Sequence, residues 1–217
     1  MHILQICDSL FPVGAFTLSN GLETYVQHDI ITSPQGLEEY LHSYISVLPY
    51  NELGAAAAAY NADEKELCRL DEIYSAAKAP FEIRSGSEKV TRRFFKICDK
   101  GQDSFTGLYK SLTEHGKCKG HQCIAYGLYM RDNGIELSEG LAVYGYSICS
   151  AIVTNCVKLV PLSQLAGQKI LGESFELISS AAEKALFTDI NDIGISGAGF
   201  DLRAMQHERL YSRQYMS

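Results

Sequence analysis

The sequence lacks the motifs by which many enzymes hold nucleotides, metals or nucleophiles. It has no Gly-x-x-x-x-Gly-Lys-Ser/Thr phosphate loop and no Gly-x-Ser-x-Gly turn to present a nucleophilic serine. Gly194, Gly197 and Gly199 follow no strand pattern, so they do not make a dinucleotide-binding turn. His207 begins a His-Glu-Arg-Leu-Tyr run, which has tyrosine where a zinc protease needs its second histidine. These absences predict that the chain is not an enzyme.

The chain also has no excess of basic residues. Its 19 lysines and arginines are outnumbered by 26 aspartates and glutamates, which gives a formal net charge of -7 at pH 7. Nucleic-acid binding depends on clustered positive charge, and this balance offsets such charge. The composition therefore argues against a nucleic-acid partner and favours a basic or cationic one.

Long apolar runs are scarce as well. No stretch approaches the ~20 apolar residues that spanning a membrane needs. Residues 1–8 have neither the basic start nor the apolar core of a signal peptide. The seven cysteines are odd in number and lack the dense, regular spacing of a secreted disulfide scaffold. We therefore expect a cytoplasmic protein with reduced thiols and no membrane association.

What the sequence does contain is helical periodicity. Its 217 residues, 46% of them hydrophobic, suffice for one domain with a full core. Every long segment repeats its apolar residues at helical spacing, and none alternates as a half-buried strand does. We expect an all-α, single-domain bundle of about eight to ten helices over residues 1–200, followed by a flexible, partner-binding tail over residues 201–217.

Capping signals place several of these helices. Ser33, followed by proline, and Asp63 are each expected to cap the start of a helix. Ser138 is expected to cap another helix. Pro161 is expected to introduce one long helix that runs through Leu186.

The best candidate for a metal site is a cluster of histidines and cysteines. Four soft or borderline ligands lie within nine positions, a density that is unusual by chance. The cysteines lack the two-residue spacing of a zinc knuckle, so packing in the core is the interpretation that we favour. The four residues are His115, Cys118, His121 and Cys123.

Several stretches resemble the UreF family of urease accessory proteins. Phe-Pro-Val-Gly-Ala-Phe at residues 11–16 and Ser-Asn-Gly-Leu-Glu at residues 19–23 resemble its N-terminal signature. Lys-Leu-Val-Pro-Leu-Ser-Gln at residues 158–164 resembles an internal motif, and Glu82-x-Arg84 resembles the Glu-x-Arg pair of the family. Met-Gln-His-Glu-Arg-Leu-Tyr-Ser-Arg at residues 205–213 is the strongest match. The resemblance runs in order from residue 4 to the end of the chain.

Two departures from the family pattern have a physical meaning. Asn20 stands where the family usually has glycine, and asparagine readily takes up the left-handed conformation that a glycine there would adopt. Lys158 stands where the family usually has arginine, so a carboxylate bound there would meet a point charge rather than a bidentate group.

The resemblance implies a non-enzymatic chaperone for nickel insertion into urease, helical and homodimeric. Its partners would be UreD (also called UreH), the GTPase UreG and apo-urease, and it would couple GTP turnover to nickel delivery into the urease active site. No cofactor would be bound firmly, because nickel would be handled by the complex. Glu23 and Lys158 would face the GTPase, and the tail would become ordered against UreD. The predicted partner-binding residues are Glu23, Lys158, Glu208, Arg209, Tyr211 and Arg213.

Two alternatives belong to other functional classes. The chain could be a metallochaperone that itself binds nickel through the four residues His115, Cys118, His121 and Cys123. It could also be a hydrolase, which would need an acid-base pair such as Glu23 with His121 or His207 brought together by the fold.

Overall fold

The computed structural model describes residues 1–195 and 197–216, and within them all regular secondary structure is helical. The predicted all-α class is confirmed. The α-helices are α1 (His2–Ile6), α2 (Leu22–Gln27), α3 (Pro34–Val47), α4 (Glu52–Asn61), α5 (Glu64–Ala77), α6 (Phe81–Ile97), α7 (Phe105–Glu114), α8 (Gln122–Asp132), α9 (Leu137–Leu159), α10 (Gln164–Glu173), α11 (Phe175–Ala185) and α12 (Ala198–His207). Three short 3-10 helices join them: η1 (Ala15–Thr17), η2 (Leu48–Tyr50) and η3 (Ile190–Asp192).

Side-chain caps start several helices where the sequence predicts them. The Ser33 hydroxyl accepts a hydrogen bond from the Gly36 N–H (3.2 Å) at the start of α3. Asp63 and Glu66 cap the start of α5 reciprocally, each side chain accepting from the other's backbone N–H. The prediction for α9 is wrong by two residues. Its cap is Glu136, whose carboxylate accepts from the Glu139 N–H (2.9 Å), and the Ser138 hydroxyl donates to that same carboxylate.

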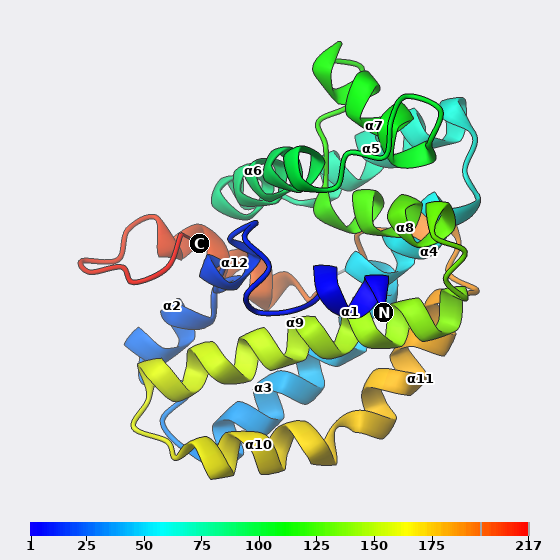
Figure 1. Ribbon diagram of the computed structural model, residues 1–217. Coiled ribbons are helices and arrows are strands. Elements are labelled where there is room, and N and C mark those ends of the chain that lie inside the picture. Colours follow the sequence, from blue (N-terminus) through cyan, green and yellow to red (C-terminus); the bar gives the residue numbers. More distant parts are fainter. Residues whose placement is uncertain (196, 217) are drawn as a thin grey trace.

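The long helix expected after Pro161 is two helices, α10 and α11. Ser174 lies between them, fully buried, with its hydroxyl donating to the Ile170 carbonyl (2.8 Å). A serine that bonds back to the carbonyl four residues earlier bends a helix. The change of direction lets α10 and α11 each pack against α9 (Figure 1). This break, together with the short helix α1, raises the number of helices above the eight to ten expected.

Helix α9 runs through the middle of the molecule (Figure 1). Helices α3, α10 and α11 pack on one side of it, α4 and α8 lie on the other, and α5, α6 and α7 lie beyond them. Among the helices of the described residues, α9 is long and apolar enough to cross a membrane, but 50% of its most apolar window is buried in the fold. Because it also contacts α1 and α2, we interpret it as the central helix of the core.

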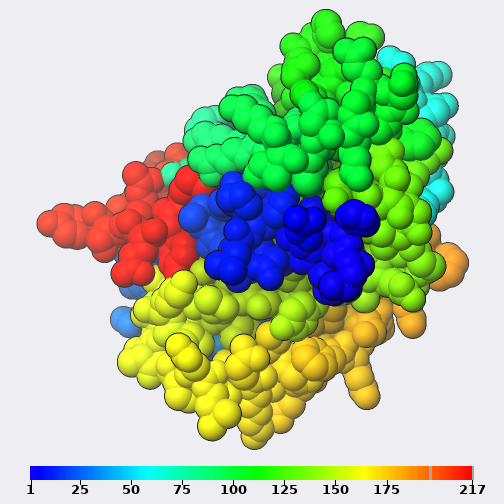
Figure 2. All heavy atoms as spheres, viewed as in Figure 1, coloured from blue at the N-terminus to red at the C-terminus, as the bar shows by residue number. Residues whose placement is uncertain are grey.

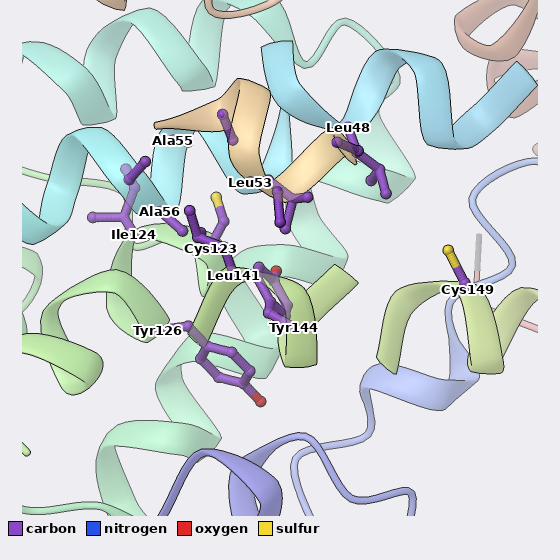
Figure 3. Packing of buried hydrophobic residues seen from close by; sticks show 14 of the residues in the cluster. Leu48, Leu53, Ala55, Ala56, Cys123, Ile124, Tyr126, Leu141, Tyr144 and Cys149 are labelled. Carbon is purple, nitrogen blue, oxygen red and sulfur yellow. The ribbon is translucent and has the colours of Figure 1, made fainter. Parts of the chain in front are cut away.

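Helices α4 and α8 pack closely against each other. The alanines of α4 bring its backbone near α8, and Gly127 completes the approach, because a Cβ at Gly127 would lie 2.1 Å from the Ala56 carbonyl oxygen. Figure 3 shows side chains of α4, α8 and α9 meeting in this part of the core, among them Ala56, Ile124 and Tyr144. Small residues in α4 thus decide where α8 lies.

The N-terminal segment, residues 7–21, lies between α6 on one side and α9 on the other (Figure 1 and Figure 2). Its backbone carbonyls are held from both sides. Arg93 of α6 donates to the Val13 carbonyl (3.1 Å), and the Asn155 amide of α9 lies 3.3 Å from the Phe16 carbonyl. Gly14 has φ +80° and Asn20 has φ +51°, so the left-handed conformation predicted for Asn20 is confirmed.

Candidate partner-binding site

Helix α12 packs against α2 and α6 and carries the chain back to the N-terminal half. The expected start of the tail, residue 201, falls inside this helix. Gly21 makes the close approach possible, because it has φ +84° and a Cβ there would lie 3.0 Å from the Ala204 N. The C-terminal segment, which we define as residues 208–216, follows α12 and lies beside the N-terminal segment (Figure 2).

His207, the last residue of α12, joins two carboxylates on two other helices. Its Nε2 lies 3.1 Å from Glu23 Oε2 on α2, and its Nδ1 lies 2.6 Å from Glu82 Oε2 on α6. The side chains of His207 and Glu23 are 0% and 1% exposed. Each ring nitrogen of His207 thus lies within hydrogen-bond distance of a carboxylate from a different helix. This triad fixes the end of α12.

The same two carboxylates also hold the C-terminal segment. Glu23 Oε1 accepts from the Gln214 N–H (2.8 Å), and Glu23 Oε2 accepts from the Tyr215 N–H (3.2 Å). The guanidinium of Arg213 donates to Glu82 Oε1 (2.8 Å). Burial and the nearby charge of Glu23 raise the pKa of the Tyr215 hydroxyl. One buried carboxylate thus orients a stretch of backbone at the end of the chain.

Two further contacts complete this docking. The Gln27 amide of α2 donates to the Ser212 carbonyl (2.7 Å), and the Met216 N–H donates to the Thr17 carbonyl (2.9 Å). These bonds use the backbone of the C-terminal segment and leave the side chain of Tyr211 free to project outward. The Tyr211 side chain is fully exposed, and Arg209 beside it is exposed too.

The sequence comparisons identify the family of the chain. A profile of the UreF family matches residues 31–174. The chain belongs to the UreF family. It is 34% identical over 221 residues to the urease accessory protein UreF of Actinobacillus pleuropneumoniae, covering 99% of this chain and 97% of that protein. It is 30% identical over 223 residues to UreF of Streptococcus salivarius (100% and 94% covered) and 34% identical over 221 residues to UreF of Haemophilus influenzae (99% and 94%).

The six residues that the UreF resemblance marks for partner binding fall in different surroundings. Glu23 is buried and its carboxylate is used within the fold, although sequence reasoning placed it on a surface that faces a partner. Lys158 is exposed in the last turn of α9. The other four, Glu208, Arg209, Tyr211 and Arg213, are exposed in the C-terminal segment. The fold links Glu23 and Arg213 through His207 and Glu82. Partner binding by the six residues stays a prediction.

Sequence reasoning gave no role to two residues that organise this site. Glu82 belongs to the Glu-x-Arg pair that resembles the UreF family, and His207 belongs to an incomplete zinc motif, to a candidate acid-base pair and to the C-terminal stretch that resembles UreF. A signal for both was present, since each lies in a stretch that resembles UreF and each is an ionisable residue on a helix that packs against the fold. The contact between them spans 125 residues of sequence, which no local pattern reports.

The candidate metal cluster is not assembled. His115 is exposed, Cys118 contacts Cys68, and His121 Nε2 lies 2.7 Å from the Ser75 hydroxyl. Burial lowers the pKa of His121 to about 4 and raises the pKa of Cys123 to about 12. Over residues 1–195 and 197–216, no three His, Cys, Asp or Glu side chains are placed to hold a metal ion. The four residues are close in sequence, but their side chains do not converge on one point. His121 and Cys123 lie beside Tyr74, whereas His115 is exposed and Cys118 contacts Cys68.

The structure contains one of the two candidate acid-base pairs of the hydrolase alternative. Glu23 and His207 do form a pair, as that alternative requires, whereas His121 lies against α5. The pair is enclosed, with both side chains at or below 1% exposure. A substrate therefore has no access to it while the C-terminal segment is docked. Relatives in the UreF family are named accessory proteins, in agreement with a structural use of the pair.

Proposed function

We propose that this chain is a non-catalytic scaffold for urease maturation. It binds UreD through its C-terminal segment, binds the GTPase UreG, and presents both to apo-urease so that GTP turnover is coupled to nickel delivery. Membership of the UreF family supports the role in maturation. The scaffold acts as a homodimer in the cytoplasm, and nickel is the cargo of the complex rather than a resident cofactor of this chain.

The observation that carries the proposal is the way in which the C-terminal segment is held. Its backbone is anchored on Glu23 and Gln27, while the side chain of Tyr211 has no covering neighbour and is fully exposed. A segment whose backbone is held by hydrogen bonds costs a partner less conformational entropy on binding than one that is not held. An exposed tyrosine beside Arg209 has the composition typical of the residues that dominate binding energy in protein interfaces.

Lys158 is the residue that we propose for the contact with the GTPase. It is an exposed cation at the end of the central helix, and it can pair with a carboxylate of a partner. Coupling to GTP turnover requires only that the scaffold bind one nucleotide state better than the other. A difference of ~1 to 3 kcal/mol suffices for such coupling.

Co-expression with UreD and UreG, followed by size-exclusion chromatography with light scattering, tests the proposal. The full chain should elute in one complex with both partners. Tyr211→Ser should lose UreD, whereas Phe187→Ser, which removes another exposed aromatic side chain outside the segment, just after α11, should keep it. A chain that ends at Glu208 retains α12 and should behave as Tyr211→Ser does. Elution of the full chain alone would overturn the scaffold proposal.

A second pair of variants addresses the GTPase. Lys158→Ala should weaken binding of UreG and leave UreD bound. Lys169→Ala is the matched control, because Lys169 is an exposed lysine on α10 whose ion pair with Glu173 (3.8 Å) lies at the surface. Equal binding of UreG by both variants would remove Lys158 from the interface and leave the UreD arm of the proposal intact.

A further inference from the structure

Two cysteines that are distant in sequence meet at the surface where α5 contacts the turn before α8. Cys118 Sγ lies 3.7 Å from Cys68 Sγ, and the two residues are 50 positions apart. Cys68 is half-buried on α5, and Cys118 is buried in the turn before α8. A shallow hollow lined by Cys68 and Lys117 opens to solvent at this point. The two sulfur atoms are in van der Waals contact, with one of them reachable from outside.

We infer that Cys68 and Cys118 are a redox-active pair that forms a reversible disulfide when the chain meets a peroxide. The bond needs the sulfurs to approach from 3.7 Å to about 2.05 Å. Side-chain rotation can supply much of this movement, because both thiols already face each other across one contact. Neither the family assignment nor the proposed scaffold role includes such a site.

Hydrogen bonds already fix the position of the turn that carries Cys118 relative to α5, which carries Cys68. One face of α5 presents Cys68, Asp71 and Ser75, at positions i, i+3 and i+7. The Asp71 carboxylate accepts from the Lys119 N–H (2.7 Å) and the Gly120 N–H (3.1 Å), directly after Cys118.

The next residues extend this alignment. The Ser75 hydroxyl lies 2.7 Å from His121 Nε2. Three residues along one face of α5 therefore contact the 118–121 turn in the order of its sequence. Tyr109 of α7 also donates to Asp71. The disulfide would therefore add a covalent link to a contact that is ordered without it.

Cys68 is the thiol that reacts first. Burial, together with the nearby Asp71 and Cys68, raises the pKa of the Cys118 thiol, so Cys118 stays protonated and shielded. The Cys68 sulfur attacks hydrogen peroxide, the O–O bond breaks, and Cys68 becomes a sulfenic acid with release of one water. The Cys118 sulfur then attacks the Cys68 sulfur, the S–O bond breaks, and the Cys118 proton leaves with the hydroxide as a second water. A dithiol reductant reverses the bond.

The other cysteines compete poorly for this bond. Cys7 is half-buried, and burial raises the pKa of its thiol to about 12. Cys149 and Cys156 lie on one helix seven residues apart, which is about 10 Å along its axis, so they cannot pair with each other. Burial raises the pKa of Cys123 to about 12, and this thiol is fully enclosed in the core. Cys98 is half-buried like Cys68 and serves as an internal control for accessibility.

Peptide mapping of the peroxide-treated full chain tests the inference directly. After alkylation of free thiols, trypsin releases Cys68 in residues 66–69 and Cys118 in residues 118–119, each with no other cysteine. The two peptides should be recovered linked, and a dithiol reductant should separate them. Cys98→Ser should leave the link unchanged, and Cys68→Ser should abolish it. Recovery of Cys118 alkylated while Cys68 is oxidised to a sulfinic acid would overturn the inference, as would a link from Cys118 to another cysteine.

A thermal melt gives a second readout that needs no variant. Closing this loop removes conformational entropy from the unfolded chain, so the oxidised protein should melt on the order of 5 °C higher than the reduced protein. An oxidised sample that melts at the same temperature or lower would mean that the bond distorts the contact between α5 and the 118–121 turn, against the inference that the pair is preset for it.

Discussion

Glu23 and His207 are 184 residues apart in the chain, yet His207 Nε2 lies 3.1 Å from Glu23 Oε2 in the interior of the molecule. The contact ties the second helix to the last one, and the remaining bonds of Glu23 extend it to the backbone of Gln214 and Tyr215. The two regions of the chain that most resemble the UreF family are therefore parts of one site. An interior carboxylate decides where the C-terminal segment lies.

Removal of His207 should destabilise the fold. In His207→Ala the carboxylates of Glu23 and Glu82 lose the group between them, and breaking a buried pair costs about 3 kcal/mol or more. Urea unfolding should show this loss in the free energy of unfolding. His28→Ala, at an exposed histidine beyond α2, should change it by less than about 0.5 kcal/mol. Equal effects of the two variants would show that the triad is not formed in solution.

The docking of the C-terminal segment should be visible in hydrogen exchange. The backbone N–H groups of Gln214 and Tyr215 donate to Glu23, so they should exchange ~10-fold or more slowly than the N–H of Tyr211, in the same segment. Glu23→Gln leaves one acceptor oxygen in place of two and should speed exchange at both sites. Fast exchange of Gln214 and Tyr215 in the unsubstituted chain would contradict the docked arrangement.

Local signals in the sequence predict most of the helices. They do not predict the features that depend on how helices pack against one another. Ser33 and Asp63 cap helices by bonds within three residues, and Asn20 needs only its own backbone angle, so all three could be predicted. The bend at Ser174 depends on how two helices fit against α9. The triad at His207 depends on three helices that no period or spacing connects, although the family resemblance marked both ends of it.

The free energy of unfolding should decrease as the pH is lowered through the range in which His121 titrates, from about 6.5 to about 4. Burial lowers its pKa from 6.5 to about 4, so between these values the unfolded chain binds a proton that the folded chain does not. The stability is fully present above pH 6.5 and decreases toward pH 4. From pH 7 to pH 5 this group should remove about 2 kcal/mol from the free energy of unfolding.

The substitution His121→Asn separates this effect from other titrations. Its loss of stability between pH 7 and pH 5 should be smaller than that of the unsubstituted chain by about 2 kcal/mol. His115→Asn, at an exposed histidine six residues earlier, should keep the full loss. The same pH dependence in all three proteins would place the titrating group elsewhere.

Two glycines in helices should respond in opposite ways to alanine. Gly127→Ala puts a Cβ 2.1 Å from the Ala56 carbonyl oxygen, so α4 and α8 must move apart at a cost of about 3 kcal/mol. Gly172→Ala, in α10 with open space around its Cβ, should stabilise the fold by about 0.5 to 1 kcal/mol. Thermal or urea unfolding measures both. A mild effect at Gly127 would mean that the α4–α8 contact is looser than described.

Reconstituted urease activation tests the central claim most directly. Apo-urease, UreD, UreG, nickel and GTP are combined with or without this chain, and nickel per urease site and urease activity are followed. The scaffold account predicts that both rise only when the chain is present, in proportion to it and with GTP required, and that Tyr211→Ser fails where Phe187→Ser succeeds. Nickel transfer that proceeds from this chain without UreG or GTP would contradict the account. It would instead favour the alternative in which this chain is itself a metallochaperone.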